Sequence, residues 1–209
     1  MTDKTLGLDN AYAMKTPEDS RRLYDQWATT YDSGFAATQE YYLPYLTAEA
    51  FHAAGGRGPV LDVGAGTGLS GTRLAELGVG PLDGLDISTK MLAVAQKKRL
   101  YSRLFLGDVT GRLDVVDGAY QGIISSGTFT LGHVGPGAIT ELLRVAASGA
   151  LFVLSVNVRH YCAAGFEQFL GGISRQITTP ALPEVAIYGG AADPAHRGDR
   201  AYLATFRKL

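Results

Sequence analysis

The chain has 209 residues, with 19 lysines and arginines against 20 aspartates and glutamates. That length suits one domain with a full core, and the net charge of -1 gives no basic excess to attract nucleic acid. The single cysteine, Cys162, excludes an internal disulfide and a cysteine-based zinc site, which is typical of a reducing compartment. The first ten residues have no apolar core of a signal peptide, and no apolar run is long enough to cross a bilayer. We therefore expect a cytoplasmic protein with no membrane segment and no nucleic-acid partner.

Residues 1–56 precede the first expected strand and are predicted to be helical. In TPEDSRRLYDQWATTYD, Thr16 can cap a helix, and Asp19 is placed to complete a capping box. Three aromatic side chains then fall on one face of that helix, namely Tyr24, Trp27 and Tyr31. A second helix is expected from near Pro44 to the glycine pair at 55–56.

From Pro59 onward, short apolar runs alternate with amphipathic stretches, which predicts strands joined by helices in a mostly parallel sheet. The first five runs are PVLDV, PLDGLDI, RLFLGDV, YQGIISS and ALFVLSVN. Helical spacing of apolar residues predicts one helix behind Pro136, over about 139–146, and another over 166–173. The runs PEVAIYGG and AYLATFRKL can pair as an antiparallel hairpin at the edge of the sheet. We therefore predict about seven strands.

The stretch PVLDVGAGTGLSG, residues 59–71, places glycines directly after the first strand. A dinucleotide fingerprint would need a third glycine where Leu69 stands, and a phosphate-binding P-loop would need a lysine that this loop lacks. Gly64, Gly66 and Gly68 instead indicate a turn that lets the backbone approach a nucleoside without a phosphate group.

Two further strands end in carboxylates. Asp86 stands twenty residues after Gly66, where a carboxylate can accept hydrogen bonds from both ribose hydroxyls. Asp108 ends the third strand, where it can accept from an adenine amino group while Val109 offers a backbone amide. The carboxyl ends of parallel strands meet at one edge of a sheet, so we expect these groups to form one ligand site.

These motifs resemble the class I S-adenosylmethionine-dependent methyltransferases over nearly the whole chain. VLDVGAGTG is similar to the first motif of that superfamily, LDIS to its ribose-binding acid and GDV to its adenine contact. YDQWATTYD is similar to the tyrosine-bearing N-terminal helix of the small-molecule branch. More narrowly, LYSRLFLGDVTGRL and SSGTFTLGHVGPGAITELLRV resemble the methyltransferase-like family associated with the Williams-Beuren region. One departure is the YQG of residues 120–122, where relatives usually carry an aromatic residue followed by aspartate.

The resemblance implies an α/β, Rossmann-like fold. Its sheet would have seven mostly parallel strands in the order 3-2-1-4-5-7-6, with strand 7 antiparallel and helices on both faces. We expect one domain over residues 1–209, in which residues 1–56 cover the site and residues 57–209 form the α/β core. The implied cofactor is S-adenosyl-L-methionine, which becomes S-adenosyl-L-homocysteine, and no metal is expected. The implied cofactor contacts are Tyr24, Tyr31, Asp62, Gly64, Ala65, Gly66, Gly68, Asp86, Ile87, Asp108, Val109 and Ser125.

The candidate catalytic residues are Tyr31 and His133. An aromatic lid would attract the sulfonium cation and exclude water from the reacting methyl group, and we expect Trp27 to be structural. His133 follows the fourth strand beside the expected substrate cleft, although the favoured interpretation is a loop histidine that hydrogen-bonds locally. In-line transfer from a sulfonium needs chiefly alignment, so a general base matters only where the nucleophile must lose a proton.

The leading hypothesis is a methyltransferase that acts on a small molecule. A nucleotide-dependent oxidoreductase is disfavoured by Leu69, and a protein that binds S-adenosylmethionine without turnover remains open. Methylation of a macromolecule is disfavoured for two reasons. The fourth strand ends in SSGTF rather than in the D/N-P-P-aromatic signature of enzymes that methylate base and side-chain amines, and no basic patch is evident. The sequence identifies neither the methyl acceptor nor the oligomeric state.

Overall fold

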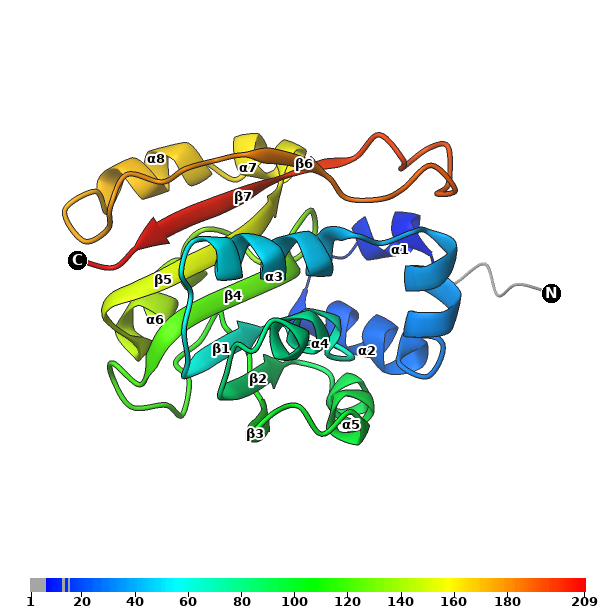
Figure 1. Ribbon diagram of the computed structural model, residues 1–209. Helices are drawn as coiled ribbons and strands as arrows, with labels where there is room; N and C mark the ends of the chain where they lie inside the picture. The colour runs from blue at the N-terminus through cyan, green and yellow to red at the C-terminus, as the bar shows by residue number, and fades with distance from the viewer. Residues whose placement is uncertain (1–6, 13, 15) are drawn as a thin grey trace.

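Seven strands form one sheet in the order β3-β2-β1-β4-β5-β7-β6 (Figure 1). The computed structural model describes residues 7–12, 14 and 16–209. Strand β7 runs antiparallel to both of its neighbours, and the other pairings are parallel. The strands are β1 Val60–Val63, β2 Leu82–Asp86, β3 Arg103–Leu106, β4 Tyr120–Phe129, β5 Ala146–Asn157, β6 Glu184–Ala186 and β7 Arg200–Arg207. The predicted fold class, strand order and edge hairpin are confirmed.

Nine helical segments are present in the described part of the chain. They are α1 Leu8–Tyr12, α2 Pro17–Trp27, the π-helix η1 Tyr31–Ala36, α3 Leu43–Ala53, α4 Leu69–Glu76, α5 Thr89–Lys97, α6 Ala138–Val145, α7 Val158–Ala163 and α8 Phe166–Gly172. The capping box of Thr16 and Asp19 forms as predicted, and α3 ends just before the glycine pair. The prediction that Tyr31 continues the helix of Tyr24 is wrong, because α2 ends at Trp27 and Tyr31 begins η1.

Buried apolar side chains form two clusters, one on each face of the sheet. Leu142 of α6 and Phe166 of α8 belong to one cluster, whereas Phe51 of α3 and Leu74 of α4 belong to the other. Alternate residues of β5 enter opposite clusters, as expected of a strand covered on both faces. Figure 1 shows α3 lying across β4 and β5 on one of these faces. Helices therefore cover both faces, and the carboxyl ends of the parallel strands are left for a site.

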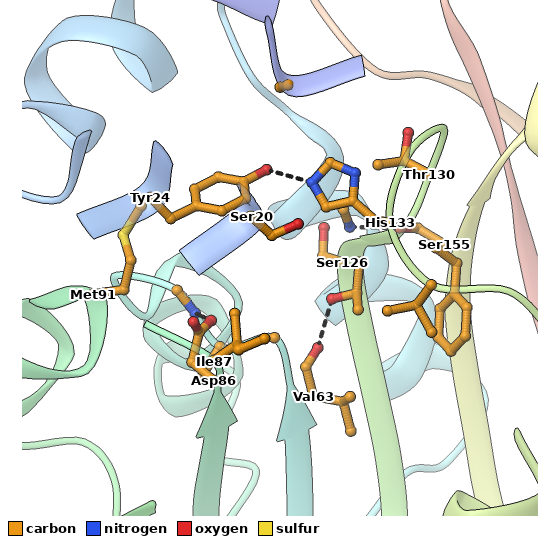
Figure 2. Close-up of a pocket in the computed structure, with 18 of the residues that line it drawn as sticks. Ser20, Tyr24, Val63, Asp86, Ile87, Met91, Ser126, Thr130, His133 and Ser155 are labelled. Carbon is orange, nitrogen blue, oxygen red and sulfur yellow. Dashed lines mark hydrogen bonds between the residues drawn. The ribbon is translucent and has the colours of Figure 1, made fainter. Parts of the chain in front are cut away.

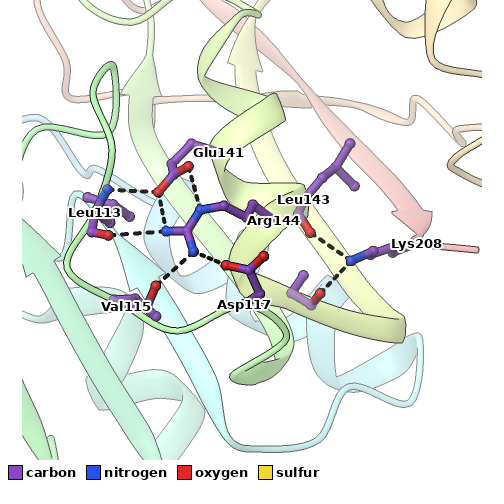
Figure 3. Close-up of polar contacts among 8 residues, drawn as sticks. Leu113, Val115, Asp117, Glu141, Leu143, Arg144 and Lys208 are labelled. Carbon is purple, nitrogen blue, oxygen red and sulfur yellow. Dashed lines mark hydrogen bonds and ion pairs between the residues drawn. The ribbon is translucent and has the colours of Figure 1, made fainter.

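A largely buried arginine fixes the long connection between β3 and β4 (Figure 3). Arg144 of α6 donates to the carbonyls of Leu113, at 3.1 Å, and Val115, at 2.8 Å, and forms ion pairs with Asp117 and Glu141. Glu141 in turn accepts from the backbone N–H of Leu113 at 2.7 Å. This clamp secures the loop that begins at Asp108, a candidate site residue.

The expectation that the first ten residues form no signal peptide falls largely on residues 1–6, which lie outside the described residues. Among the residues that the structure describes, no helix is long and apolar enough to cross a membrane.

Candidate functional site

A cavity lies at the carboxyl ends of β1, β2, β4 and β5, beneath α2 and η1 (Figure 2). Its walls include parts of the glycine loop (residues 64–68), the ends of β2 and β3, and the loop after β4. Ile187 and Tyr188 approach from the distant hairpin. The cavity therefore occupies the edge at which open α/β sheets bind ligands.

The glycine loop needs its glycines for two different reasons. Gly64 has φ +69°, and a Cβ added there would lie 2.0 Å from Thr128 Oγ1, so the neighbouring strand leaves no space for a side chain. Gly66 has φ +55°, but an added Cβ would meet only Gly64 O, at 4.0 Å. Gly66 lines the cavity, so a side chain there would occupy ligand space rather than protein space.

Asp86 joins the end of β2 to the glycine loop. Its Oδ2 accepts from Gly66 N at 2.8 Å, and its Oδ1 accepts from Ser88 N at 2.8 Å. Burial raises the pKa of Asp86 to about 6, although these backbone hydrogen bonds favour the ionised form. The carboxylate lines the cavity, so one group both shapes the loop and presents negative charge to a ligand.

Asp108 and Val109 line the cavity after β3, and Ile87 does so after β2. Asp108 Oδ1 accepts from the backbone N–H of Thr110 at 2.8 Å and from its hydroxyl at 2.6 Å. These bonds fix the turn and use only one oxygen of the carboxylate. The other oxygen remains compatible with the expected adenine contact.

Aromatic side chains from α2 and η1 cover the cavity. Trp27 stacks on Tyr24 with ring centroids 6.2 Å apart and meets Tyr31 edge-on at 5.4 Å. All three line the cavity, so the predicted aromatic face forms although Tyr31 lies in a separate helix. Burial raises the pKa of both tyrosines, so their hydroxyls stay protonated at neutral pH.

Two aspartates tie this aromatic cover to the rest of the site. Asp25 of α2 accepts from the hydroxyl of Ser88 at 2.6 Å. Asp32 of η1 forms an ion pair with Lys98 at 2.8 Å and accepts from the hydroxyl of Thr67 in the glycine loop. The cover is therefore bonded to the loops that flank the cavity and does not depend on apolar packing alone.

Tyr24 and His133 form a hydrogen-bonded pair in the cavity wall (Figure 2). His133 Nδ1 lies 2.9 Å from the carbonyl of Leu131, which can only accept, so Nδ1 carries a hydrogen. Burial lowers the pKa of His133, and the neutral ring then leaves Nε2 to accept from the Tyr24 hydroxyl at 3.1 Å. The unprotonated Nε2 of His133 therefore lies within hydrogen-bond distance of the Tyr24 hydroxyl, and both residues line the cavity.

Comparison with known proteins gives consistent results. Residues 60–149 match the family model described as a methyltransferase domain. Methyltransferase-like protein 27 of Homo sapiens is 35% identical over 148 residues, which cover 68% of this chain and 60% of the human protein. Demethylmenaquinone methyltransferase of Beutenbergia cavernae is 32% identical over 146 residues, covering 68% and 59%. The solved structure of the cyclase SpnF is 19% identical, with a TM-score of 0.67 over 93% of this chain and 97% of that chain, which shows the fold alone.

The chain carries a class I S-adenosylmethionine-dependent methyltransferase domain. It spans about three fifths of the length of the two curated relatives. The cofactor of this methyltransferase domain is S-adenosyl-L-methionine. The cavity fits such a cofactor, because Gly66 leaves open space beside the acidic end of β2.

The structure brings most predicted cofactor residues of the methyltransferase domain to the cavity. Those that line it are Tyr24, Tyr31, Gly64, Ala65, Gly66, Asp86, Ile87, Asp108 and Val109. Asp62, Gly68 and Ser125 do not line it. The hydroxyl of Ser125 instead donates to the carbonyl of Val63 at 2.8 Å, so it joins β4 to β1, and the next residue, Ser126, faces the cavity.

Asp62 and Gly68 meet Tyr101 beneath the glycine loop. Asp62 Oδ2 accepts from the Tyr101 hydroxyl at 2.7 Å, and burial raises the pKa of this carboxyl to about 7. A Cβ on Gly68, whose φ is +89°, would lie 3.2 Å from the same ring. Both residues therefore pack on Tyr101 outside the cavity lining, and their expected contacts with the cofactor stay predictions.

Several lining residues carried no signal in the sequence. Phe35 follows the predicted aromatic face, whereas Tyr41 and Tyr188 lie 147 positions apart in the sequence and pack in a tilted arrangement with ring centroids 5.6 Å apart. Asn157 ends β5 and also lines the cavity. Only spacing within a motif predicts a site residue from sequence, and these residues meet only through the tertiary fold.

Proposed function

We propose that this protein transfers a methyl group from S-adenosylmethionine to a small-molecule acceptor. The observation that carries the proposal is Asp86, which holds Gly66 in place and faces the same cavity as the ends of β1 and β3. The 35% identity to Methyltransferase-like protein 27 supports the narrower placement in the Williams-Beuren-region family. The free cysteine, Cys162, is compatible with a reducing cytoplasm.

The proposed cofactor site uses the half of the cavity formed by β1, β2 and β3. The backbone of residues 64–66 would approach the cofactor, Asp86 would accept from the ribose hydroxyls, and Asp108 with Val109 would meet the adenine. The bound cofactor supplies a sulfonium methyl group, whose carbon bonds to the acceptor while the electron pair of its former bond stays on sulfur. The aromatic cover would exclude water from the site and attract the cation. In this proposal residues 1–56 cover the α/β core of residues 57–209 within one domain.

Tyr24 and His133 are proposed to remove a proton from the acceptor. The acceptor proton passes to Tyr24 Oη while the tyrosine proton passes to His133 Nε2, and Leu131 O stabilises the resulting imidazolium through Nδ1. In this proposal His133 keeps the catalytic role expected of it, and Tyr24 takes the catalytic role that was expected of Tyr31. The depressed pKa of His133 keeps Nε2 available at neutral pH.

Two measurements test this function. Calorimetric titration with S-adenosylhomocysteine should give binding and NAD(H) should give none, whereas the reverse result supports an oxidoreductase. Incubation with S-adenosylmethionine and a metabolite extract should then release S-adenosylhomocysteine above background. His133→Gln should lower that release by about 100-fold or more while leaving S-adenosylhomocysteine affinity unchanged, because general-base catalysis contributes at least that factor. Binding without release by any extract would instead support a cofactor-binding protein without turnover.

A further inference from the structure

Asn157 ends β5, caps α7 and lines the cavity. Its Oδ1 accepts from the backbone N–H groups of Arg159, at 2.9 Å, and His160, at 3.3 Å. These two donors fix the orientation of the amide, because only the oxygen can face them. The Nδ2 group therefore has to point away from the helix.

The Nδ2 group of Asn157 has no hydrogen-bond partner among the described residues, although the residue is only 3% exposed. A buried donor without a partner costs about 1–3 kcal/mol, so it calls for an explanation. Capping does not supply one, because serine, threonine or aspartate caps a helix as well and carries no such amide. Because the Nδ2 atom is itself buried, an oxygen acceptor on a ligand would satisfy the group only after a shift of the side chains around it.

The position of Asn157 assigns that ligand to the acceptor rather than to the cofactor. Asp86 and Asp108 end β2 and β3, whereas Asn157 ends β5, on the other side of β1 and β4 in the sheet order. Neighbouring strands lie about 4.8 Å apart, so the donor is well separated from both acids. The Tyr24–His133 pair lines the same cavity from α2 and the loop after β4.

The walls of the cavity restrict the charge and shape of the acceptor. Neither lysine nor arginine occurs among the described residues that line it, so no protein side chain would neutralise a buried carboxylate or phosphate. Rings of Tyr24, Tyr31 and Tyr188 supply flat apolar surface, which suits a planar compound. An uncharged oxygen, such as a ketone carbonyl, is the acceptor that Asn157 can satisfy.

We propose that the methyl acceptor is an uncharged hydroxyaryl ketone or a similar planar compound, whose carbonyl oxygen accepts from Asn157 Nδ2 and whose hydroxyl faces Tyr24. This rests on the proposed methyl transfer, and it makes Asn157 a specificity-determining residue. The amide donor of Asn157 then favours acceptors with a carbonyl oxygen over acceptors that lack one, and the surrounding aromatic wall favours uncharged compounds.

The test is a binding titration of the full chain saturated with S-adenosylhomocysteine. The probes are the three hydroxyacetophenone isomers, the matching ethylphenols, which lack the carbonyl oxygen, and the matching hydroxybenzoates, which carry a charge. We expect at least one ketone to bind about 10-fold more tightly than its ethyl counterpart, because one hydrogen bond accounts for roughly that factor. The hydroxybenzoates should bind most weakly.

Variants separate the donor from the cap. Asn157→Ser keeps a capping oxygen and removes the amide donor, so it should bind ketones and ethylphenols alike and keep its affinity for S-adenosylhomocysteine. Asn157→Ala removes both and controls for the loss of the cap, which melting temperatures would report. Preserved discrimination in Asn157→Ser, tighter binding of hydroxybenzoates, or no binding by any probe would overturn the proposal. Failure of wild-type protein to bind S-adenosylhomocysteine would instead overturn the proposed function.

Discussion

The two halves of the cavity are built in different ways. The half over β1, β2 and β3 consists of backbone and strand-end carboxylates, and Asp86 already uses both oxygens on the loops around it. The half over β4 and β5 consists of side chains from the loop after β4, the end of β5 and the distant hairpin, whereas α2 and η1 cover both halves. There, Asn157 carries a buried donor without a partner among the described residues.

This difference separates cofactor binding from acceptor choice. Groups that already form hydrogen bonds within the protein hold one geometry. Changes in the half over β1, β2 and β3 should therefore reduce affinity for the cofactor. Groups with unused hydrogen-bonding capacity accept whichever ligand satisfies them, so changes in the second half should alter turnover or specificity instead.

The largest expected effect is that of Gly66→Val. Its side chain would enter open space in the cavity, so S-adenosylhomocysteine affinity should fall by about 100-fold or more, while the left-handed backbone costs roughly 1–2 kcal/mol of stability. Gly78→Val is a matched control, since Gly78 also has positive φ, at +71°, with nothing within 4 Å of an added Cβ, and does not line the cavity. Calorimetry and thermal melting should show similar destabilisation in both and loss of affinity only in the first. Equal affinities would mean that Gly66 serves the turn alone.

Asp86→Ala comes next, with an expected 10- to 100-fold loss of S-adenosylhomocysteine affinity, because hydrogen bonds to a charged group contribute about 1.5–3 kcal/mol each. The pKa of Asp86 is raised to about 6, so wild-type affinity should rise as pH increases through 6, when the carboxyl ionises. Calorimetry between pH 5 and 8 measures this, and a flat profile would place the ribose elsewhere.

Asp62→Asn should affect stability rather than affinity, because Asp62 lies outside the cavity lining. Its pKa is raised to about 7, so the folded protein binds more protons than the unfolded chain from about pH 4 to 7. The free energy of unfolding of wild-type protein without ligand should therefore fall as pH rises across that window. Denaturant titrations should give a shallower decline for the asparagine variant, and an unchanged slope would refute the assignment.

Hydrogen exchange should distinguish two segments that flank the cavity. Residues 18–32 are held by Asp25 and by Asp32, whose pair with Lys98 is partly exposed and therefore weak. Residues 113–117 are held by the multiple bonds of Arg144, which is largely buried. We expect S-adenosylhomocysteine to slow exchange in the first segment several-fold and to leave the second unchanged. Equally slow exchange of residues 18–32 with and without ligand would show that α2 is a fixed part of the fold.

Tyr31→Phe should have the smallest effect, less than about 2-fold on S-adenosylhomocysteine affinity, because Tyr24 rather than Tyr31 meets His133. Tyr31→Ala should cost about 10-fold, because it removes the ring that packs on Trp27 and Phe35. If both variants lose affinity equally, the hydroxyl makes a polar contact. Calorimetric titration of the two proteins decides between a lid and a polar role.

The sequence by itself determined the strands, the edge hairpin and the residues of the glycine loop. These features depend on apolar periodicity and on backbone conformations that glycine alone adopts easily, both of which are local properties. The same local pattern could not show that Asp62 faces Tyr101 or that α2 ends before Tyr31.

Only the tertiary structure decided which side chains form the half of the cavity over β4 and β5, where the acceptor is proposed to bind. Tyr24 and His133 are 109 residues apart, and Asn157 joins them through the register of β5 beside β4. No spacing along the chain encodes such a meeting, because it follows from how strands align and helices pack once the whole core is buried. The strand ends can thus be identified from sequence, whereas the side chains that select the acceptor come together only in the fold.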